Sequence, residues 1–493
     1  MFIVYSLIWR WVAEGYAHEE PGKGLFEVGE RYFNMLIDRS MILAVEEPYH
    51  NIIYACRVHD LVLDMIHFLS EDKSFVTASN SNRTFPRTTT RRLAINNEVI
   101  EQDGSVANSS MQQVRSYNAI MCHFRVLPLL SNFKALRVLA LEECTFMGSK
   151  QFSMKPEDYP YHLKHLGRLI HLRYLGISYQ LESLEVPDEI GDLRFLQVLE
   201  LGRSGIKKLP QSVGRLTQLK CLHFGGSSMG VLDWTNLTSL EALQLHHVSP
   251  DFLKGLGTLK ELRELNLHFG EHNNMLFKDL MGRLVNLQKL QVIVVICWYQ
   301  EDPEPWSDYA GSVALGHLRH LTVCGLLPGL PVWINSSCLP NLCHLSMQLK
   351  AMESQDMEIL GRFSELITLC IHCKDGVVFP HTMEGAFPKL RHLGLRNSNQ
   401  PRFVRGVMSS LECFEFTGLV RANGLDFHSL AIRSHLPSLE EVDAEFEGKT
   451  GMDSDVRQAT LRHWRQARAS LKHAVEIHPN HPALTSRGRQ MDD

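Results

Sequence analysis

The feature that most constrains this sequence is a pattern of apolar residues that returns at a fixed period. Residues 196–219 read LQVLELGRSGIKKLPQSVGRLTQL; they open with the spacing L-x-x-L-x-L at Leu196, Leu199 and Leu201 and reach the next L-x-x-L at Leu219. A recurrence every roughly 20–29 residues is typical of a solenoid. One such repeat cannot bury its own apolar side chains, so the pattern predicts a stack in which each repeat packs on the next.

The same opening recurs along most of the chain. Its mean spacing is about 25 residues. Two weaker openings come first, at Leu93 with Ile95 and at Val114 with Tyr117. Thirteen clear openings follow at Leu136, Leu172, Leu196, Leu219, Leu240, Leu262, Leu287, Leu318, Leu342, Leu366, Leu390, Leu411 and Leu439. We therefore predict an α/β fold, a leucine-rich-repeat solenoid of horseshoe form, with loops in the two longest gaps and an acidic, proline-rich loop at 301–311.

The spacing also predicts which side chains point inward. In L-x-x-L-x-L a short strand lies on the middle residues, and successive side chains of a strand point to opposite faces. Leu199 and Leu222 should therefore lie in the core. Glu200 and His223 should face outward on the concave side, where we expect solvated side chains whose replacement has little effect on stability.

Residues 1–75 lack the repeat and have a different pattern. Apolar residues at helical spacing predict helices over residues 7–14 and 25–36, and short apolar runs predict strands over 40–45 and 54–58. A third helix is expected over residues 60–69, with Leu61, Met65, Ile66 and Leu69 facing inward. Helices followed by a two-stranded wing describe a small, mainly helical winged-helix domain.

Three stretches of this region resemble one known family. LIWRWVAEGY (7–16), YFNMLIDRSMI (32–42) and CRVHDLVLDMI (56–66) are similar to the winged helix of plant intracellular nucleotide-binding, leucine-rich-repeat disease-resistance proteins of the coiled-coil type. Val58-His59-Asp60 matches the Met-His-Asp motif of that family, with Val in place of Met, and HAVEIHPNHP (473–482) resembles the tails of some members. The resemblance implies that His59 and Asp60 contact a bound nucleotide.

The family also has a phosphate-binding loop, G-x-x-x-x-G-K-[ST], whose backbone amides surround the phosphates. The nearest stretch here, AHEEPGKG (17–24), lacks the first Gly and the final Ser or Thr, and we interpret it as a turn. We therefore expect no cofactor, with ADP or ATP bound only where a fuller product supplies the nucleotide-binding domain. A winged helix of this family without its phosphate-binding loop favours a truncated receptor or an incomplete gene model.

Composition changes mark the predicted domain boundaries. The winged helix occupies 1–75, and a Ser/Thr/Asn-rich linker occupies 76–89. The solenoid follows over 90–445. Residues 446–493 should form a C-terminal helix, which could cap the open end of the stack, and a disordered tail over the last ten residues.

Charge and cysteine usage narrow the function classes. The formal net charge is −5, which argues against a general nucleic-acid binder. The 11 cysteines are scattered, as expected for free thiols in a reducing compartment. The N-terminus has no basic segment before its apolar run, and no run of about 18 apolar residues occurs. We predict a cytoplasmic protein without a membrane span.

Few residues suggest chemistry. Cys370-x-x-Cys373 has the spacing of two zinc ligands, but a structural site needs four, and the nearest other cysteines lie on another repeat. His478 and His481 fit a turn better than a metal site. No Ser/His/Asp or Cys/His set forms a catalytic motif, so we expect neither a metal site nor an enzyme.

The concave positions offer candidates for binding a partner protein. Three histidines occupy equivalent outward positions, and outward positions near the C-terminus become acidic, which favours a basic partner. These candidate residues are His320, His344, His392, Glu412, Glu415, Glu440, Glu441 and Asp443.

Charge also segregates between the two predicted domains. Residues 1–55 carry eight acidic and four basic side chains, whereas residues 83–137 carry three acidic and eight basic ones. A short tether raises the effective concentration of one domain near the other. We therefore expect the winged helix to dock on the first end of the solenoid through these opposite charges.

The sequence thus favours a non-enzymatic recognition protein of plant innate immunity, which binds a pathogen effector or a guarded host protein or restrains a signalling partner. Three alternatives stay open: a nucleotide-operated switch, a transcription-linked winged helix, and an adaptor. The candidate DNA-reading helices carry few basic residues, such as Arg31 and Arg39, which weakens the second.

Overall fold

The structure is a computed structural model of the full chain. It describes residues 2–46, 53–73, 77–79, 91–97, 99–100, 111–124, 130–146, 163, 165–178, 185–229, 232–269, 274–297, 315–373, 385–396, 406–419, 435–447 and 454–489. The chain divides into two compact units, Met1–Leu267 and His268–Asp493. The predicted acidic loop at 301–311 and most of the predicted linker lie outside the described residues.

The first unit begins with the N-terminal module, residues 2–73, whose helices and strands follow the prediction closely. The elements are β1 (Phe2–Ile3), α1 (Val4–Glu14), α2 (Leu25–Asp38), β2 (Ile42–Glu46), β3 (Ile53–Val58) and α3 (Asp60–Lys73). The strands pair antiparallel in the order β1-β3-β2. A core of Ile8, Phe33, Ile42 and Cys56 joins the helices to this wing.

Two glycines fix how the helices of the module meet. Gly15 follows α1 with a φ of +86°, a left-handed conformation that glycine adopts without steric cost, and it ends the helix. Gly29 on α2 faces α1, where a Cβ atom would lie 2.6 Å from Cγ2 of Ile8. A larger residue at position 29 would therefore push the two helices apart.

The orientation predicted for the third helix is wrong. Leu61, Met65, Ile66 and Leu69 were expected to face inward, but their exposed fractions in α3 are 74%, 50%, 41% and 47%. The apolar spacing predicted the helix correctly, but spacing alone does not show whether another element packs on the apolar side. Within the described residues no element covers this apolar stripe.

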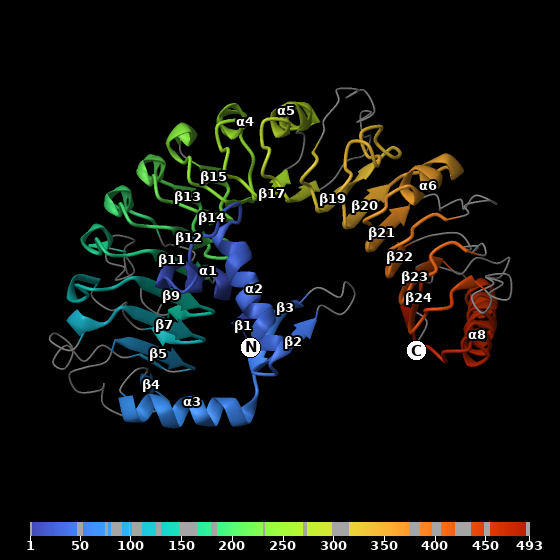
Figure 1. Ribbon diagram of the computed structural model, residues 1–493, viewed down its shortest axis with the longest axis horizontal. Helices are drawn as coiled ribbons and strands as arrows, with labels where there is room; N and C mark the ends of the chain where they lie inside the picture. The colour runs from blue at the N-terminus through green and yellow to red at the C-terminus, as the bar shows by residue number, and fades with distance from the viewer. Residues whose placement is uncertain are drawn as a thin grey trace. The chain divides into compact units, whose positions relative to one another are not determined.

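The rest of the first unit is a parallel ladder of repeats (Figure 1). The ladder runs in the order β4-β5-β7-β9-β11-β12-β14-β16-β17. The strands of the ladder are β4 (Thr77–Ser79), β5 (Arg92–Asn96), β7 (Ser116–Ile120), β9 (Val138–Glu142), β11 (Tyr174–Ser178), β12 (Val198–Leu201), β14 (Cys221–Phe224), β16 (Ala242–Leu245) and β17 (Glu264–Phe269). β4 thus adds a strand inside the segment predicted as linker.

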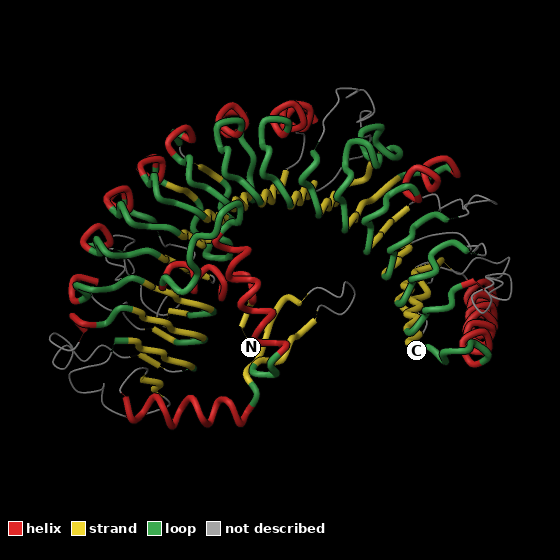
Figure 2. Tube along the Cα trace, viewed as in Figure 1, coloured by secondary structure: helices red, strands yellow, loops and turns green. Residues whose placement is uncertain are grey.

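Short elements complete the turns of these repeats. Figure 2 shows helical turns opposite the ladder strands in the repeats from β5 to β17. The additional strands are β6 (Val99–Ile100), β8 (His123–Phe124), β10 (Thr145–Phe146), β13 (Lys208–Leu209) and β15 (Ser228–Met229). The 3-10 helices are η1 (Met111–Gln113), η2 (Leu130–Asn132), η4 (Leu166–Arg168), η5 (Asp188–Asp192), η6 (Gln211–Arg215) and η7 (Trp234–Asn236), and one turn is the α-helix α4 (Pro250–Leu256).

The inward leucines form the core of the ladder, as predicted. Leu175, Leu199, Leu222 and Leu243 lie directly beside one another on successive strands, and each is at most 1% exposed. Burying one such side chain contributes about 1.5–3 kcal/mol. The stack therefore draws its stability from apolar contacts between neighbouring repeats.

The second unit continues the same repeat. Its strands are β18 (Val292–Cys297), β19 (His320–Leu327), β20 (His344–Leu349), β21 (Thr368–Cys373), β22 (His392–Arg396), β23 (Cys413–Leu419), β24 (Glu441–Glu447) and β25 (Ala483–Arg489). Its helices are α5 (Asn274–Leu284), α6 (Ser354–Gly361) and α8 (Ser454–Glu476). Adjacent strands pair in parallel from β18 to β25.

One predicted opening is displaced. The strand expected to open at Leu287 opens at Leu290, and Ile293 and Val295 take its inward positions. The backbone confirms the correction, since the amide of Arg319 in the next repeat donates to the carbonyl of Gln291, directly after Leu290. Leucines at both 287 and 290 made the pattern ambiguous.

The C-terminal end differs from the expectation of disorder. β25 covers residues that were assigned to a disordered tail, and it pairs with β24 over its whole length. The predicted C-terminal helix is α8, in which Leu471 is buried. His478 lies in the turn that follows; its Nε2 is 3.0 Å from the carbonyl oxygen of Leu436, so it is a buried structural residue.

No helix in the described part of the chain is long and apolar enough to cross a lipid bilayer.

Candidate functional site

The concave face of the first unit is covered by the N-terminal module. In Figure 1, α1 lies against the strands near β9 and β11. The strand side chains of this contact, which we call the first concave surface, are Val138, Ala140, Tyr174, Val198, Cys221 and Ala242; the module side chains packed on them are Trp9, Val12, Ala13, Ala17, Leu25 and Val28. All of these residues are buried, so the contact has a continuous apolar core.

Aromatic side chains fill the centre of the contact. The ring of Trp9 lies 5.3 Å from that of Phe26, and Tyr5 lies 5.2 Å from Phe26. The hydroxyl of Tyr5 is 3.6 Å from the sulfur of Cys221 on β14. Offset and tilted ring pairs of this kind add to the stabilisation that burial gives. The contact is therefore held first by apolar and aromatic packing.

Glu200 corrects one expectation from the sequence. It was predicted to be solvated, but it is 8% exposed. The hydroxyl of Tyr174 donates to its carboxylate at 2.5 Å, and Arg10 of α1 lies 3.4 Å from the same hydroxyl. Burial raises the pKa of Glu200, while Tyr174 and Arg10 oppose that rise. Strand alternation gave the correct direction for Glu200, but it could not show that the module covers it.

A carboxylate of the repeats caps a helix of the module. Gly24 precedes α2 and has no side chain to accept a hydrogen bond from the first turn. Instead the amide of Leu25 donates to Oε2 of Glu241 at 3.1 Å, and Nζ of Lys220 lies 3.0 Å from Oε1 of the same carboxylate. An acceptor and a negative charge both stabilise a helix N-terminus. Glu241 thus fixes the position of α2 on the repeats.

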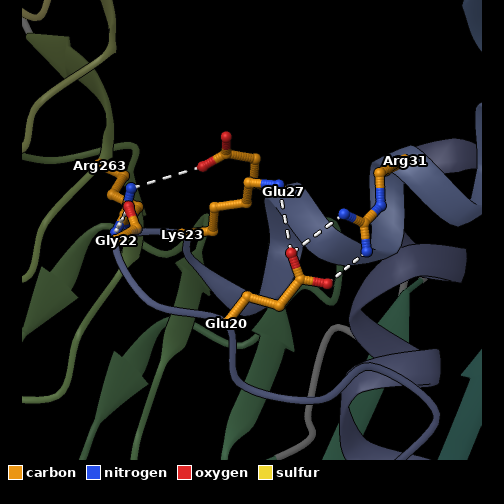
Figure 3. A network of polar contacts seen from close by, with 6 residues as sticks. All are labelled: Glu20, Gly22, Lys23, Glu27, Arg31 and Arg263. Atoms are coloured by element: carbon orange, nitrogen blue, oxygen red, sulfur yellow. Dashed lines mark hydrogen bonds and ion pairs between the residues drawn. The ribbon is translucent and has the colours of Figure 1, made fainter.

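A second polar group lies at the start of β17 (Figure 3). Nη2 of Arg263 is 3.3 Å from the carbonyl oxygen of Gly22, and its Nη1 is 3.6 Å from the carboxylate of Glu27 on α2. The neighbouring Glu20 accepts from both Lys23 and Arg31 within the module, which holds the loop before α2. These interactions surround the apolar core with polar contacts.

The predicted docking through opposite charges describes only part of this contact. Glu14 pairs with Arg92 at 3.1 Å and also contacts Ser116. However, Arg10 pairs with Glu142, so one charge pair has the opposite polarity to the prediction. The contact also extends to β16, beyond the basic segment. The sequence contained a signal that the charge argument did not use: outward positions such as Val138 and Val198 are apolar in these repeats, which favours an apolar contact on the concave side.

The second unit has a polar concave face, which we call the second concave surface. His320, His344, Thr368, His392, Cys413 and Glu441 occupy one register row across its strands. The rings of His320 and His344 stack with centroids 4.1 Å apart. Burial, then the neighbouring His344 and Arg319, lower the pKa of His320 to about 4. Burial also lowers the pKa of His344, so both rings are neutral near pH 7.

The third predicted histidine is in a different environment. His392 is 3% exposed, and its Nε2 lies 3.4 Å from Oε1 of Glu415 on β23. Glu441 and Asp443 pair in register with Cys413 and Glu415, so three predicted carboxylates gather on adjacent strands. Burial, with help from Asp443 and Glu441, raises the pKa of Glu415 to about 8, although Arg396 opposes the rise.

The other two predicted glutamates lie at the strand ends. Glu412 precedes β23, and its carboxylate is 3.5 Å from Nη1 of Arg391. Glu440 precedes β24 and is exposed. A cavity of about 390 Å³ lies beside Glu412; it is lined by Ile367, Lys389, Arg391, Ser410, Glu412 and Ser438. Glu412 therefore belongs to this mixed-charge edge and not to the acidic group on the strands.

The remaining candidates sit apart from both surfaces. His59 and Asp60 are exposed at the start of α3, where Nδ1 of His59 accepts from the amide of Leu61 at 3.3 Å. The side chain of His59 thus caps the start of this helix. Cys370 and Cys373 lie on opposite faces of β21, and Cys373 is buried in the core, so the pair cannot share a metal ion.

Comparison with known proteins identifies the family. The family model described as a leucine-rich repeat region matches residues 113–484, and the model described as the disease resistance protein winged helix domain matches residues 2–66. Disease resistance protein RGA5 of Oryza sativa subsp. japonica is 25% identical over 496 residues, which cover 96% of this chain and 42% of that protein.

Two further relatives give the same picture. Disease resistance protein Pik-2 of Oryza sativa subsp. japonica is 24% identical, over 73% of this chain and 38% of its own length. RPP8-like protein 2 of Arabidopsis thaliana is 24% identical, over 88% of this chain and 51% of its own length. The chain thus spans about two fifths to one half of these relatives. It belongs to the leucine-rich-repeat family, and its N-terminal residues match the winged-helix model of disease resistance proteins, the class that the names of its relatives also give.

Proposed function

We propose that this chain is a non-enzymatic recognition part of a plant immune receptor, which acts in the cytoplasm in defence against pathogens. Its repeats bind a pathogen effector or a guarded host protein, and the N-terminal module restrains them until that ligand binds. The match to the disease resistance winged-helix model and the names of the relatives support the defence role. The observation that carries the restraint is the module packed on the first concave surface.

The contact is suited to control because binding and docking compete for one surface. A ligand that needs the first concave surface must displace Trp9 and its neighbours, so the free energy of docking is subtracted from its affinity. The second concave surface offers carboxylates at Glu415, Glu441 and Asp443. Because Glu441 and Asp443 place negative charge on this surface, a ligand with a basic face would associate there first.

A nucleotide-operated switch is the second candidate. It is favoured by the exposure of His59 and Asp60, which leaves the motif side chains accessible to a partner domain. This function requires a longer product that supplies the phosphate-binding loop. Calorimetry with ADP on such a product, with and without His59→Ala, tests it: loss of affinity in the variant supports nucleotide contact, and equal affinity rejects it.

The defence role is tested in plants that lack the gene and carry one of three versions of the chain. Wild type should restore resistance to a subset of pathogen isolates, and Leu222→Ala, which opens the repeat core, should not. The variant Phe195→Ala, which alters an aromatic residue that is 57% exposed, should behave as wild type. Unchanged growth of every isolate in plants without the gene would contradict the proposal.

Restraint by the module predicts a separate phenotype. Trp9→Ala should activate defence without a pathogen, measured as cell death in leaves, because it loosens the module on the repeats. Phe195→Ala at equal protein level is the matched control. If Trp9→Ala accumulates normally and leaves remain healthy, the module does not restrain the repeats.

A further inference from the structure

One strand of the second unit departs from the burial pattern of its neighbours. β19, β20 and β21 alternate between half-exposed or exposed and buried residues, whereas the first four residues of β22 are all buried. Two of them, His392 and Gly394, face the concave side. The side chains that surround these two residues make up the cluster described next.

Three possible metal ligands converge there from two adjacent strands. His392 lies on β22, directly beside Cys413 on β23, and Glu415 is two residues further along β23. One ring nitrogen of His392, the sulfur of Cys413 and one carboxylate oxygen of Glu415 all lie within 4.8 Å of one another. The exposed fractions of His392 and Cys413 are 3% and 8%, so the group is largely shielded from water.

A glycine brings a fourth possible ligand close to this group. Gly394 pairs with Cys370 of β21 on one side and with Glu415 of β23 on the other. A Cβ atom at Gly394 would lie 3.1 Å from the sulfur of Cys370 and 3.7 Å from Oε2 of Glu415. Because position 394 has no side chain, the sulfur of Cys370 and the carboxylate of Glu415 both come close to it from the neighbouring strands.

We propose that His392, Cys413, Glu415 and Cys370 form a zinc site on the concave side of β21, β22 and β23. One imidazole, one carboxylate and two thiolates are ligand types that zinc takes in tetrahedral sites. Metal–ligand distances of about 2.0–2.3 Å place the ligand atoms roughly 3.3–3.8 Å apart. The donor atoms of His392, Cys413 and Glu415 therefore need to approach by only about 1 Å, which side-chain rotation allows. Cys370 lies outside the distance that joins these three, so its side chain has to rotate further to complete the site.

The surrounding charge favours a cation. Glu441 and Asp443 of β24 pair in register with Cys413 and Glu415. Arg396 lies two residues beyond Gly394 on β22 and is exposed. An alkaline-earth ion would prefer an all-oxygen site, so the sulfur and nitrogen donors select a softer ion. A bound ion would join three consecutive repeats and stabilise the second concave surface.

Cobalt(II) titration of the full, tag-free chain after chelator treatment tests the site, because cobalt bound to thiolates has a charge-transfer absorption band. We expect one equivalent to produce the band and zinc to displace it. Cys413→Ser and His392→Gln should weaken binding by at least about tenfold. The matched controls Cys343→Ser and His344→Gln, which alter the same residue types outside the cluster, should bind as wild type.

Circular dichroism of each variant establishes that it is folded. A folded wild-type chain with no thiolate band would overturn the proposal. So would a band of equal strength and affinity in Cys413→Ser, which would place the metal at another thiol. Cys370→Ser should reduce the band and the affinity, and an unchanged band would remove Cys370 from the ligand set.

Discussion

The two concave surfaces are built on one repeat, yet their burial differs. In β9, β11 and β12 nearly every strand residue is buried, on both faces. In β19 and β20 buried residues alternate with half-exposed ones. The inward leucines are equivalent in both, so the fold does not cause the difference. The outward residues cause it: they are mainly apolar and covered by the N-terminal module in β9, β11 and β12, and mainly polar in β19 and β20.

This difference shows that the repeat and its surface are specified separately. The period of leucines fixes the stack, whereas the residues between them decide whether a protein segment or solvent lies on the concave side. An apolar row such as Val138, Tyr174 and Val198 would be costly to leave in water, and the module buries it. A histidine row such as His320 and His344 has no such requirement.

The largest effect should follow from removing the centre of the covered surface. Trp9→Ala should cost about 3–5 kcal/mol, because Trp9 is fully buried against α2 and the repeats. Denaturant unfolding followed by circular dichroism measures the loss. Phe195→Ala should cost less than about 0.5 kcal/mol, because Phe195 is mostly exposed. Equal losses in the two variants would mean that the module does not pack on the repeats.

Two glutamates at equivalent places compare the surfaces directly. Glu241 and Glu440 each directly follow the opening leucine of a repeat. Glu241 is buried and caps the N-terminus of α2, whereas Glu440 is exposed. Glu241→Ala should cost about 1–3 kcal/mol, because the amide of Leu25 and Lys220 lose their acceptor. Glu440→Ala should cost less than about 0.5 kcal/mol. The reverse order in chemical unfolding would refute the cap.

We expect the stability of the folded chain to depend on pH through Glu264, the first residue of β17. Burial, then Glu30, raise the pKa of Glu264 from 4.5 to about 7. The folded state therefore favours the neutral acid, and this contribution is complete below about pH 4.5 and is lost as pH rises through 7. Glu264→Gln keeps a neutral side chain. The Tm of this variant relative to wild type should increase between pH 4.5 and 7.5; a constant difference would show that the pKa of Glu264 is not raised in the folded state.

The histidine stack should respond to pH in the opposite direction. The pKa of His320 falls from 6.5 to about 4 in the folded state, mainly because of burial. Its contribution to stability is therefore complete above about pH 6.5 and is lost as pH falls towards 4. In thermal melts, the Tm of His320→Gln should fall less than the Tm of wild type as pH is lowered from about 6.5 to about 4. Parallel pH curves for the two proteins would argue against a buried, neutral stack.

The sequence predicted what depends on local spacing. Strand openings, inward leucines and the helices of the module follow from periods that neighbouring residues share, and only the opening at Leu287 was displaced. It could not predict contacts between distant segments: Glu200 was expected in solvent, and the stripe of Leu61 and Met65 was expected to be buried. The cluster at His392 was also missed, because its ligands come from separate strands and follow no linear motif.

Thiol labelling of Cys221 in the full chain tests the central claim, that the module covers the first concave surface. Cys221 is an outward strand residue and is fully buried beneath Tyr5. We predict that mass spectrometry will find Cys221 protected in the native wild-type chain while the half-buried Cys338 reacts, and that Trp9→Ala will expose Cys221 at unchanged repeat structure. Labelling of Cys221 in the wild-type chain as fast as that of Cys338 would contradict the account.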